Sequence, residues 1–136
     1  MLAEIQQGTF DRLTADAGVS ALVQAIHSGR APQAADGQVN SPFPYLVISG
    51  VTAQPWDTKD TLGRNVIMQV DCYARTQSDL AFRAILDAVH MALHRQPLTV
   101  GALNWVDTQA ENLIEGFEDD GKTRRAVMDF RVIVTA

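Results

Sequence analysis

The sequence predicts a single α+β domain over residues 1–136, built on one mainly antiparallel four-stranded sheet with helices packed on one face. Three observations lead to this prediction. Four segments have the two-residue alternation or the β-branched composition of strands, and a segment between them has helical periodicity. No repeat, low-complexity stretch or long linker divides the chain. Two strand pairs separated by a helix, after two N-terminal helices, give the order α-α-β-β-α-β-β.

The composition is that of an ordinary globular protein. Hydrophobic residues make up 46% and charged residues 20% of the chain. The net charge of −5, from 11 Lys and Arg against 16 Asp and Glu, disfavours a nucleic-acid-binding protein, which normally presents a basic stripe to phosphates. A single cysteine, Cys72, leaves no internal disulfide and favours a reducing compartment. We expect a soluble protein made in a cytoplasm, without a signal peptide or a membrane span.

The sequence of the N-terminal third predicts two helices followed by a loop. A first helix is expected from Leu2 to Asp16, where Gly8 weakens it by roughly 1 kcal/mol relative to alanine. Ser20 is then placed to cap a short second helix that extends through Ile26. The stretch from Gly29 to Pro44 contains three prolines and two glycines, which predicts a surface loop.

The region from Arg64 to Arg95 is the best-defined unit, a strand followed by a helix. Side chains alternate between apolar and polar from Asn65 to Ala74, as in a strand with one buried face. Ser78 is a natural N-cap because its hydroxyl can accept from the free amides of the first turn, and Pro97 closes the helix. The helical spacing is carried by Phe82, Ile85, Leu86, Val89 and Leu93.

Three further strands are predicted on either side of this unit. Tyr45 to Thr52 is a β-branched run of strand length, and a long, exposed and mobile connection from Ala53 to Arg64 follows it. Trp105 to Phe117 and Arg124 to Val134 are the last two strands. The turn from Glu118 to Lys122 joins them, since its Asp-Gly pair suits a hairpin. In the third strand one face is expected to carry Val106, Thr108, Ala110 and Ile114.

Two histidines are the main candidates for chemistry. His90 and His94 lie four residues apart on one helix face, a spacing that metal ligands use. The glutamate of a His-Glu-x-x-His motif is missing, because Met91 follows His90. The histidines also lie on the polar stripe opposite the core, so solvated side chains are the preferred interpretation. A small metal-binding enzyme that uses these histidines is the alternative.

No other pattern favours an enzyme. The acidic residues between Asp107 and Asp120 alternate along a solvated strand face, with no sign of a desolvated pocket. Cys72 has no adjacent basic residue and points inward, which disfavours a nucleophile. Phosphate-binding glycine loops, nucleophile elbows and Cys-x-x-Cys pairs do not occur. We therefore expect no catalytic residue, no cofactor and no bound metal.

Apolar residues on outward strand positions indicate an interaction surface instead. They are expected on three strands of one sheet, which favours a face covered by a second subunit or, equally, by the N-terminal helices. Trp56 in the connection before the central strand is interpreted as presented to a partner. The outward apolar residues are Ile67, Tyr73, Leu113, Val127 and Ile133.

Nearly the whole chain resembles the tail-completion (tail-terminator) proteins of long-tailed phages, prophages and gene transfer agents. Leu13 to Val23 is similar to the opening helices of that family, and Pro42 to Ile48 to its approach to the first strand. Val66 to Arg75, with the alanine-rich helix that follows, resembles its central strand–helix unit. Arg124 to Val132 resembles its closing strand.

The resemblance implies a structural virion protein without cofactors, not an enzyme. It implies a ring, usually a hexamer, that caps the last ring of tail-tube subunits, stops tube growth and presents the surface that joins the head. The implied partners are further copies, the tail-tube protein and a head-completion or connector protein, while DNA passes through the lumen without specific binding. Assembly into the neck end of the virion tail follows synthesis in the bacterial host cytoplasm. A head-completion or connector protein of the same neck is the alternative.

Within this family we expect contacts from sheet edges and from the 53–64 loop, by strand addition or by loop packing. The acidic hairpin from Glu115 to Asp120 is expected to face the lumen, where negative charge keeps DNA from sticking. The candidate interaction residues are Trp56, Asp57, Asp60, Ile67, Tyr73, Glu115, Asp119 and Asp120.

Overall fold

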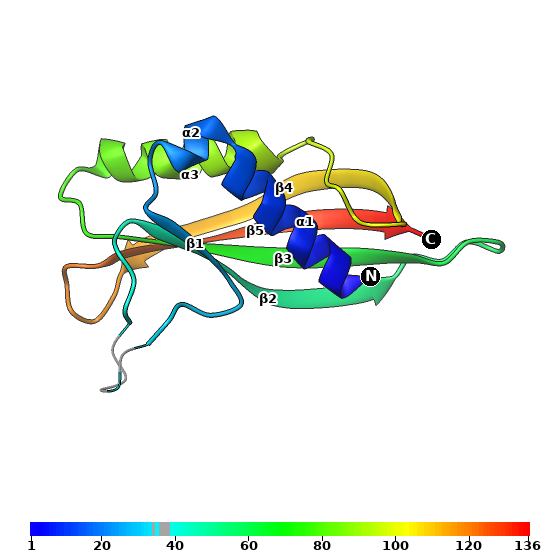
Figure 1. The fold of residues 1–136 in the computed structure, drawn as a ribbon, viewed down its shortest axis with the longest axis horizontal. Coiled ribbons are helices and arrows are strands. Elements are labelled where there is room, and N and C mark those ends of the chain that lie inside the picture. The colour runs from blue at the N-terminus through cyan, green and yellow to red at the C-terminus, as the bar shows by residue number, and fades with distance from the viewer. Residues whose placement is uncertain (34, 36–38) are drawn as a thin grey trace.

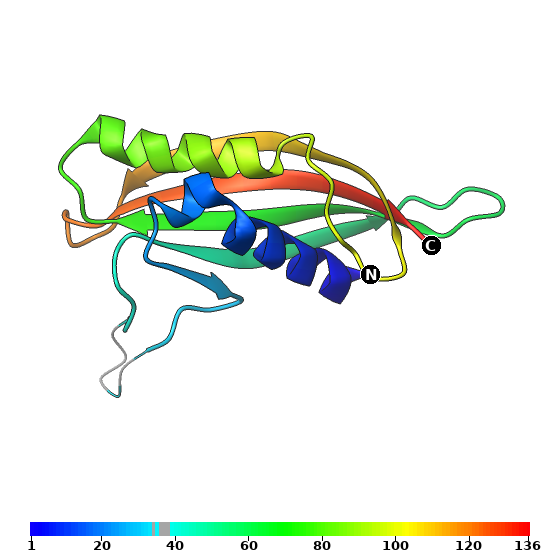
Figure 2. The same cartoon turned by 45° about the horizontal axis from the view of Figure 1, so that its top comes forward.

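The computed structural model describes residues 1–33, 35 and 39–136 and contains a five-stranded mixed sheet with helices on one face (Figures 1 and 2). The strands are ordered β1-β2-β3-β5-β4 across the sheet. The elements are α1 (Leu2–Ala15), α2 (Ala17–Ser20), β1 (Ala25–Ser28), β2 (Tyr45–Pro55), β3 (Gly63–Ala74), α3 (Asp79–Leu93), β4 (Asn104–Phe117) and β5 (Arg124–Thr135).

The predicted α+β class is confirmed, but the predicted four-stranded antiparallel sheet is wrong. A fifth strand, β1, pairs in parallel with the start of β2. It occupies the place where the sequence predicts the end of a second helix. The α2 helix is capped by Asp16, whose carboxylate accepts from the Val19 amide at 3.0 Å, and it ends at Ser20, the residue predicted to cap it. The chain then extends, because β2 offers it a parallel partner.

All three helices in the described part of the chain lie on the same face of the sheet, as Figure 2 shows. The predicted packing of helices on one face is therefore confirmed, and the idea that the N-terminal helices cover the opposite face is wrong. Arg12 of α1 ties the two long helices together by donating to the Ala92 carbonyl at 2.7 Å and to Gln96 at 3.1 Å. The core between helices and sheet includes Ile5, Leu13, Leu46, Met68, Val70, Phe82, Leu93 and Phe130.

The α3 helix follows its sequence signals closely. Ser78 caps it, since its hydroxyl accepts from the Ala81 amide at 3.1 Å. The predicted apolar stripe is buried against the sheet. On the preceding strand Cys72 is fully buried, as predicted, and burial raises the pKa of its thiol to about 12.

Two register shifts in β4 change which residues share a face. They lie between Trp105 and Asp107 and between Ala110 and Asn112. Each shift interrupts the simple alternation of side chains, so the predicted face with Val106, Thr108, Ala110 and Ile114 together is wrong. Leu113 pairs with Met128, whose side chain is buried under the helices, so Leu113 lies on the helix side of the sheet and not, as predicted, on the face away from the helices. Ile114, which pairs with Val127, lies on the face away from the helices instead.

The connection between β2 and β3 is a long hairpin with a short tip. Strand pairing continues to Pro55 and resumes at Gly63, so the predicted loop from Ala53 to Arg64 is partly strand. At the tip the Asp57 carboxylate accepts from the Gly63 amide at 2.9 Å, and the Trp56 amide donates to the Gly63 carbonyl at 3.1 Å. None of the described helices is both long enough and apolar enough to span a membrane.

Candidate assembly surfaces

The predicted interaction residues do not form one site. The tip that carries Trp56, Asp57 and Asp60 lies at one end of the elongated sheet, and the turn between β4 and β5 lies at the other (Figure 1). All three tip residues are exposed, and the Trp56 side chain is 41% accessible. An indole that remains this accessible is free to meet a partner. The two ends therefore form separate surfaces.

The acidic turn uses one of its carboxylates for its own structure. Asp120 accepts from the backbone amides of Lys122 and Thr123, each at 2.8 Å, and from the Thr123 hydroxyl at 2.7 Å. These bonds, above all the one from the Thr123 amide, lower the pKa of Asp120 to about 2. Asp119 is exposed beside it. Gly121 has a φ of 68°, the positive value that the predicted Asp-Gly turn requires.

Glu115 does not belong to this turn. It pairs in register with Ala126, which is buried under the helices, so it lies on the helix side of β4. Its carboxylate accepts from the Arg83 guanidinium of α3 at 2.6 Å. Both side chains are accessible, so the pair contributes little to stability.

The sheet face opposite the helices, here called the outer face, carries most of the predicted outward apolar residues. Ile67, Tyr73, Val127 and Ile133 are half-buried on it. No described helix lies over this face. Ile114 is the most accessible apolar side chain here, at 64%. The alternation in the sequence therefore predicts four of the five outward apolar residues correctly, and Leu113 of β4 is the exception.

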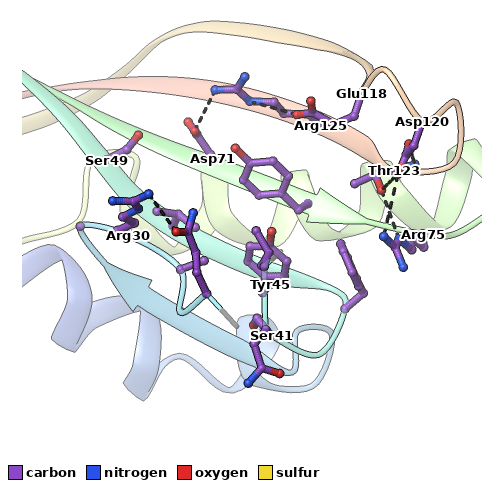
Figure 3. A pocket seen from close by; sticks show the side chains of 18 residues that line it. Arg30, Ser41, Tyr45, Ser49, Asp71, Arg75, Glu118, Asp120, Thr123 and Arg125 are labelled. Carbon is purple, nitrogen blue, oxygen red and sulfur yellow. Dashed lines mark hydrogen bonds and ion pairs between the residues drawn. The ribbon is translucent and has the colours of Figure 1, made fainter. Parts of the chain in front are cut away.

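A pocket of about 800 Å³ lies on one end of the outer face, beneath described residues of the segment between β1 and β2 (Figure 3). Its floor is aromatic. The Tyr45 and Tyr73 rings stack with centroids 5.0 Å apart, and Arg75 lies over the Phe43 ring at 4.3 Å. Desolvation raises the pKa of Tyr45 to about 12 and also raises the pKa of Tyr73.

A buried carboxylate borders the same pocket. The Asp71 side chain is only 6% accessible and accepts from the Arg125 guanidinium at 3.1 Å (Figure 3). It also accepts from the side-chain amide of Gln69 at 3.2 Å. The alternation from Asn65 to Ala74 puts Asp71 among the outward, polar positions of the strand, but it does not indicate that the carboxylate is buried. An aspartate in the middle of a β-branched strand was the available signal, because aspartate is depleted there.

The two histidines of α3 are adjacent but differently engaged. The rings stack with centroids 4.7 Å apart, and His94 Nδ1 accepts from the Ala110 amide at 3.0 Å. That bond occupies one of the two nitrogens that a metal could use. Among the described residues, no group of three His, Cys, Asp or Glu side chains is placed to hold a metal ion.

The edge of the sheet formed by β4 exposes several large apolar side chains. β4 is the last strand in the order, and it pairs only with β5 among the described strands. Leu113, Ile114 and Phe117 near its end are 47%, 64% and 61% accessible. An unpaired strand edge with large apolar side chains invites strand addition.

Comparisons with known proteins agree with the fold. A chain in the virion of a native gene transfer agent particle superposes with a TM-score of 0.82 at 19% identity, covering 97% of this chain and 95% of that one. The gp17 protein of bacteriophage SPP1 superposes with a TM-score of 0.62 at 23% identity, covering 97% and 91%. No curated protein matches the sequence. The family model "Tail completion protein gp17" matches residues 8–135, which confirms the resemblance, and the chain belongs to this tail-completion family.

Proposed function

We propose that this protein assembles as a ring of identical copies at the end of a virion tail, stops growth of the tail tube and provides the surface that joins the head. The observation that carries the proposal is the family match over residues 8–135. The ring, which we take to be a hexamer, would contact the tail-tube protein on one side and a head-completion or connector protein on the other. The particle would be a phage, a prophage-encoded particle or a gene transfer agent.

The form of the molecule supports a scaffold role. Its accessible features include a strand edge, a sheet face on which no described helix lies, and two protruding turns at opposite ends. A ring needs two different surfaces on each copy that meet head to tail, and a sheet with two unlike edges supplies them. The family points to a structural, non-enzymatic protein.

Deletion of the gene tests the proposal. We expect tails of variable and greater length that do not join to filled heads, with both defects corrected by the wild-type gene. Electron microscopy of negatively stained lysates measures both effects. Normal joined particles would refute the proposal. Tails of normal length with heads that lose DNA would favour the head-completion role instead.

The acidic turn is proposed to face the lumen, where its charge would let DNA pass. Reversal of Glu118 and Asp119 to lysine, with Asp120 kept because it stabilises the turn, should leave tail length unchanged and reduce DNA delivery. Two exposed helix positions, Asp11 and Asp87, provide the matched lysine control. If the turn variant delivers DNA as well as this control does, the turn does not act in DNA passage.

A further inference from the structure

Two short segments form the opposite edges of the described sheet. At the β4 edge the chain from Leu113 to Gly116 follows the last register shift, so its strand is regular. At the other edge β1 runs from Ala25 to Ser28 and pairs only with β2 among the described strands. Neither segment contains lysine or proline, the residues that commonly protect an edge from pairing.

The register places these segments at the same height along the strands. Ala25 is paired through Tyr45, Tyr73 and Arg125 to Gly116. The three following rows match in the same way and join Ile26 to Glu115, His27 to Ile114, and Ser28 to Leu113. A second copy placed beside the first therefore needs no shift along the strands to align β1 with this part of β4.

Direction and facing also agree. β1 is parallel to β2, and the three remaining pairings are antiparallel, so β1 and β4 run in opposite directions. If neighbouring copies keep the same orientation, their meeting edges would form an antiparallel pair, which allows well-aligned hydrogen bonds. In the matched rows Ile114 and His27 lie on the outer face, while Glu115 and Ile26 lie on the helix side.

We propose that Leu113–Gly116 of one copy pairs with Ala25–Ser28 of the next, which continues the sheet from copy to copy around the ring. This inference rests on the ring in the proposed function and names its contact. A closed ring relates neighbouring copies by a rotation without a translation along the ring axis. Such a rotation requires that the two meeting edges lie at the same height along the strands. The pairing would cover Ile114, the most exposed apolar side chain of the outer face.

Paired cysteines test the contact directly. Ala25→Cys and Gly116→Cys fall in one row, and a side chain at Gly116 would meet nothing within 4 Å. Directly opposed residues of antiparallel strands have Cα atoms about 4.5–5.5 Å apart, within the range that a disulfide spans. The native Cys72 is fully buried and does not compete. The matched control combines Ala25→Cys with Asn112→Cys, four rows away, or roughly 13 Å along the strand.

The variants are tested in tails purified from particle-producing cells, after mild oxidation, on non-reducing gels. We expect a ladder of covalent multimers from the Ala25/Gly116 pair and no ladder from the Ala25/Asn112 pair. A covalent dimer from the single Gly116→Cys variant would overturn the proposal, since it would indicate twofold pairing of two β4 edges.

An amine-reactive cross-linker separates the two possible failures. If it joins several copies in tails while the cysteine pair gives no ladder, the ring stands and the edge contact is wrong. If the protein is absent from tails or present as one copy, the proposed function fails together with the contact.

A single substitution keeps the test valid if the cysteine variants do not fold. Ile114→Lys places a charge on the edge, whereas Leu80→Lys makes the same change at an α3 side chain that is 81% accessible. We expect Ile114→Lys to remove the protein from tails and Leu80→Lys to leave its amount unchanged. Circular dichroism of the purified variants checks that both fold. Incorporation of folded Ile114→Lys at the wild-type level would overturn the proposal.

Discussion

The Asp71 carboxylate accepts a hydrogen bond from the Arg125 guanidinium at 3.1 Å, on a sheet face that no described helix covers. The two side chains differ in accessibility, at 6% for Asp71 and 41% for Arg125. Because water barely reaches the Asp71 carboxylate, its hydrogen bonds come from Arg125 and from the side-chain amide of Gln69. A buried charge that loses such a partner is costly.

Arg125→Met should destabilise the fold by about 2 kcal/mol, because it leaves the Asp71 carboxylate without its cationic partner while keeping an apolar stem. Urea unfolding followed by circular dichroism gives the value. Arg131→Met is the matched control on the same strand, where the partner Glu111 is exposed. The control should change stability by less than about 0.5 kcal/mol. Equal effects of the two substitutions would contradict a special role for Asp71.

Gly8 of α1 is required by packing, although the sequence suggests only that it weakens the helix. A Cβ at this position would lie 2.6 Å from the Thr99 carbonyl oxygen. Gly8→Ala should therefore lower the free energy of unfolding by about 1–3 kcal/mol, despite a gain in helix propensity of roughly 1 kcal/mol. Gly116→Ala, where the added atom meets nothing within 4 Å, is the control and should be near neutral. Stabilisation by Gly8→Ala would show that α1 can move away from the 98–100 segment.

The His90 and His94 pair should not act as a metal site. His94 Nδ1 already accepts from the Ala110 amide, so His94→Ala should cost about 1 kcal/mol, while exposed His90→Ala should cost close to nothing. One equivalent of zinc should leave the melting temperature of the wild-type protein unchanged. A zinc-dependent rise that disappears in both variants would restore the metal-binding alternative.

Local signals explain the parts of the fold that the sequence predicts correctly. Ser78 and the apolar stripe of α3 define that helix within fifteen residues, and the alternation of β3 and β5 needs no distant information. The strand β1 cannot be predicted from local signals, because it has only four residues and its partner β2 lies beyond a long loop. Its residue Ile26 continues an apolar pattern that a helix would also produce.

The surface residues also fall into those that local patterns predict and those that depend on the register between strands. Alternation places Ile67 and Tyr73 on the outer face, and loop composition predicts the exposure of Trp56. The β4 register shifts are not encoded by any turn residue, so Leu113 is assigned to the wrong face. The Asp71–Arg125 pair depends on the register between β3 and β5, which only the assembled sheet defines.

The acidic turn should lose stability in acid through Asp120. Its three hydrogen bonds hold the pKa at about 2 in the folded protein, below the ordinary value of 3.8. Because the folded pKa is the lower one, the charged carboxylate stabilises the fold fully above the unfolded pKa, and this contribution is lost as the pH falls through about 2. Asp120→Asn removes that charge. It should lower the melting temperature at neutral pH, and its difference from wild type should shrink as the pH falls from about 5 towards 2.

Melting curves across this range, followed by circular dichroism, measure the difference between the two proteins. Asp119→Asn, at the exposed neighbour in the same turn, controls for the loss of one negative charge and should differ little from wild type at neutral pH. A difference between Asp120→Asn and wild type that stays constant with pH would contradict this prediction, because it would mean that ionisation of Asp120 does not stabilise the fold. The hydrogen bonds from Lys122 and Thr123 would then stabilise the turn equally well with a protonated carboxyl group.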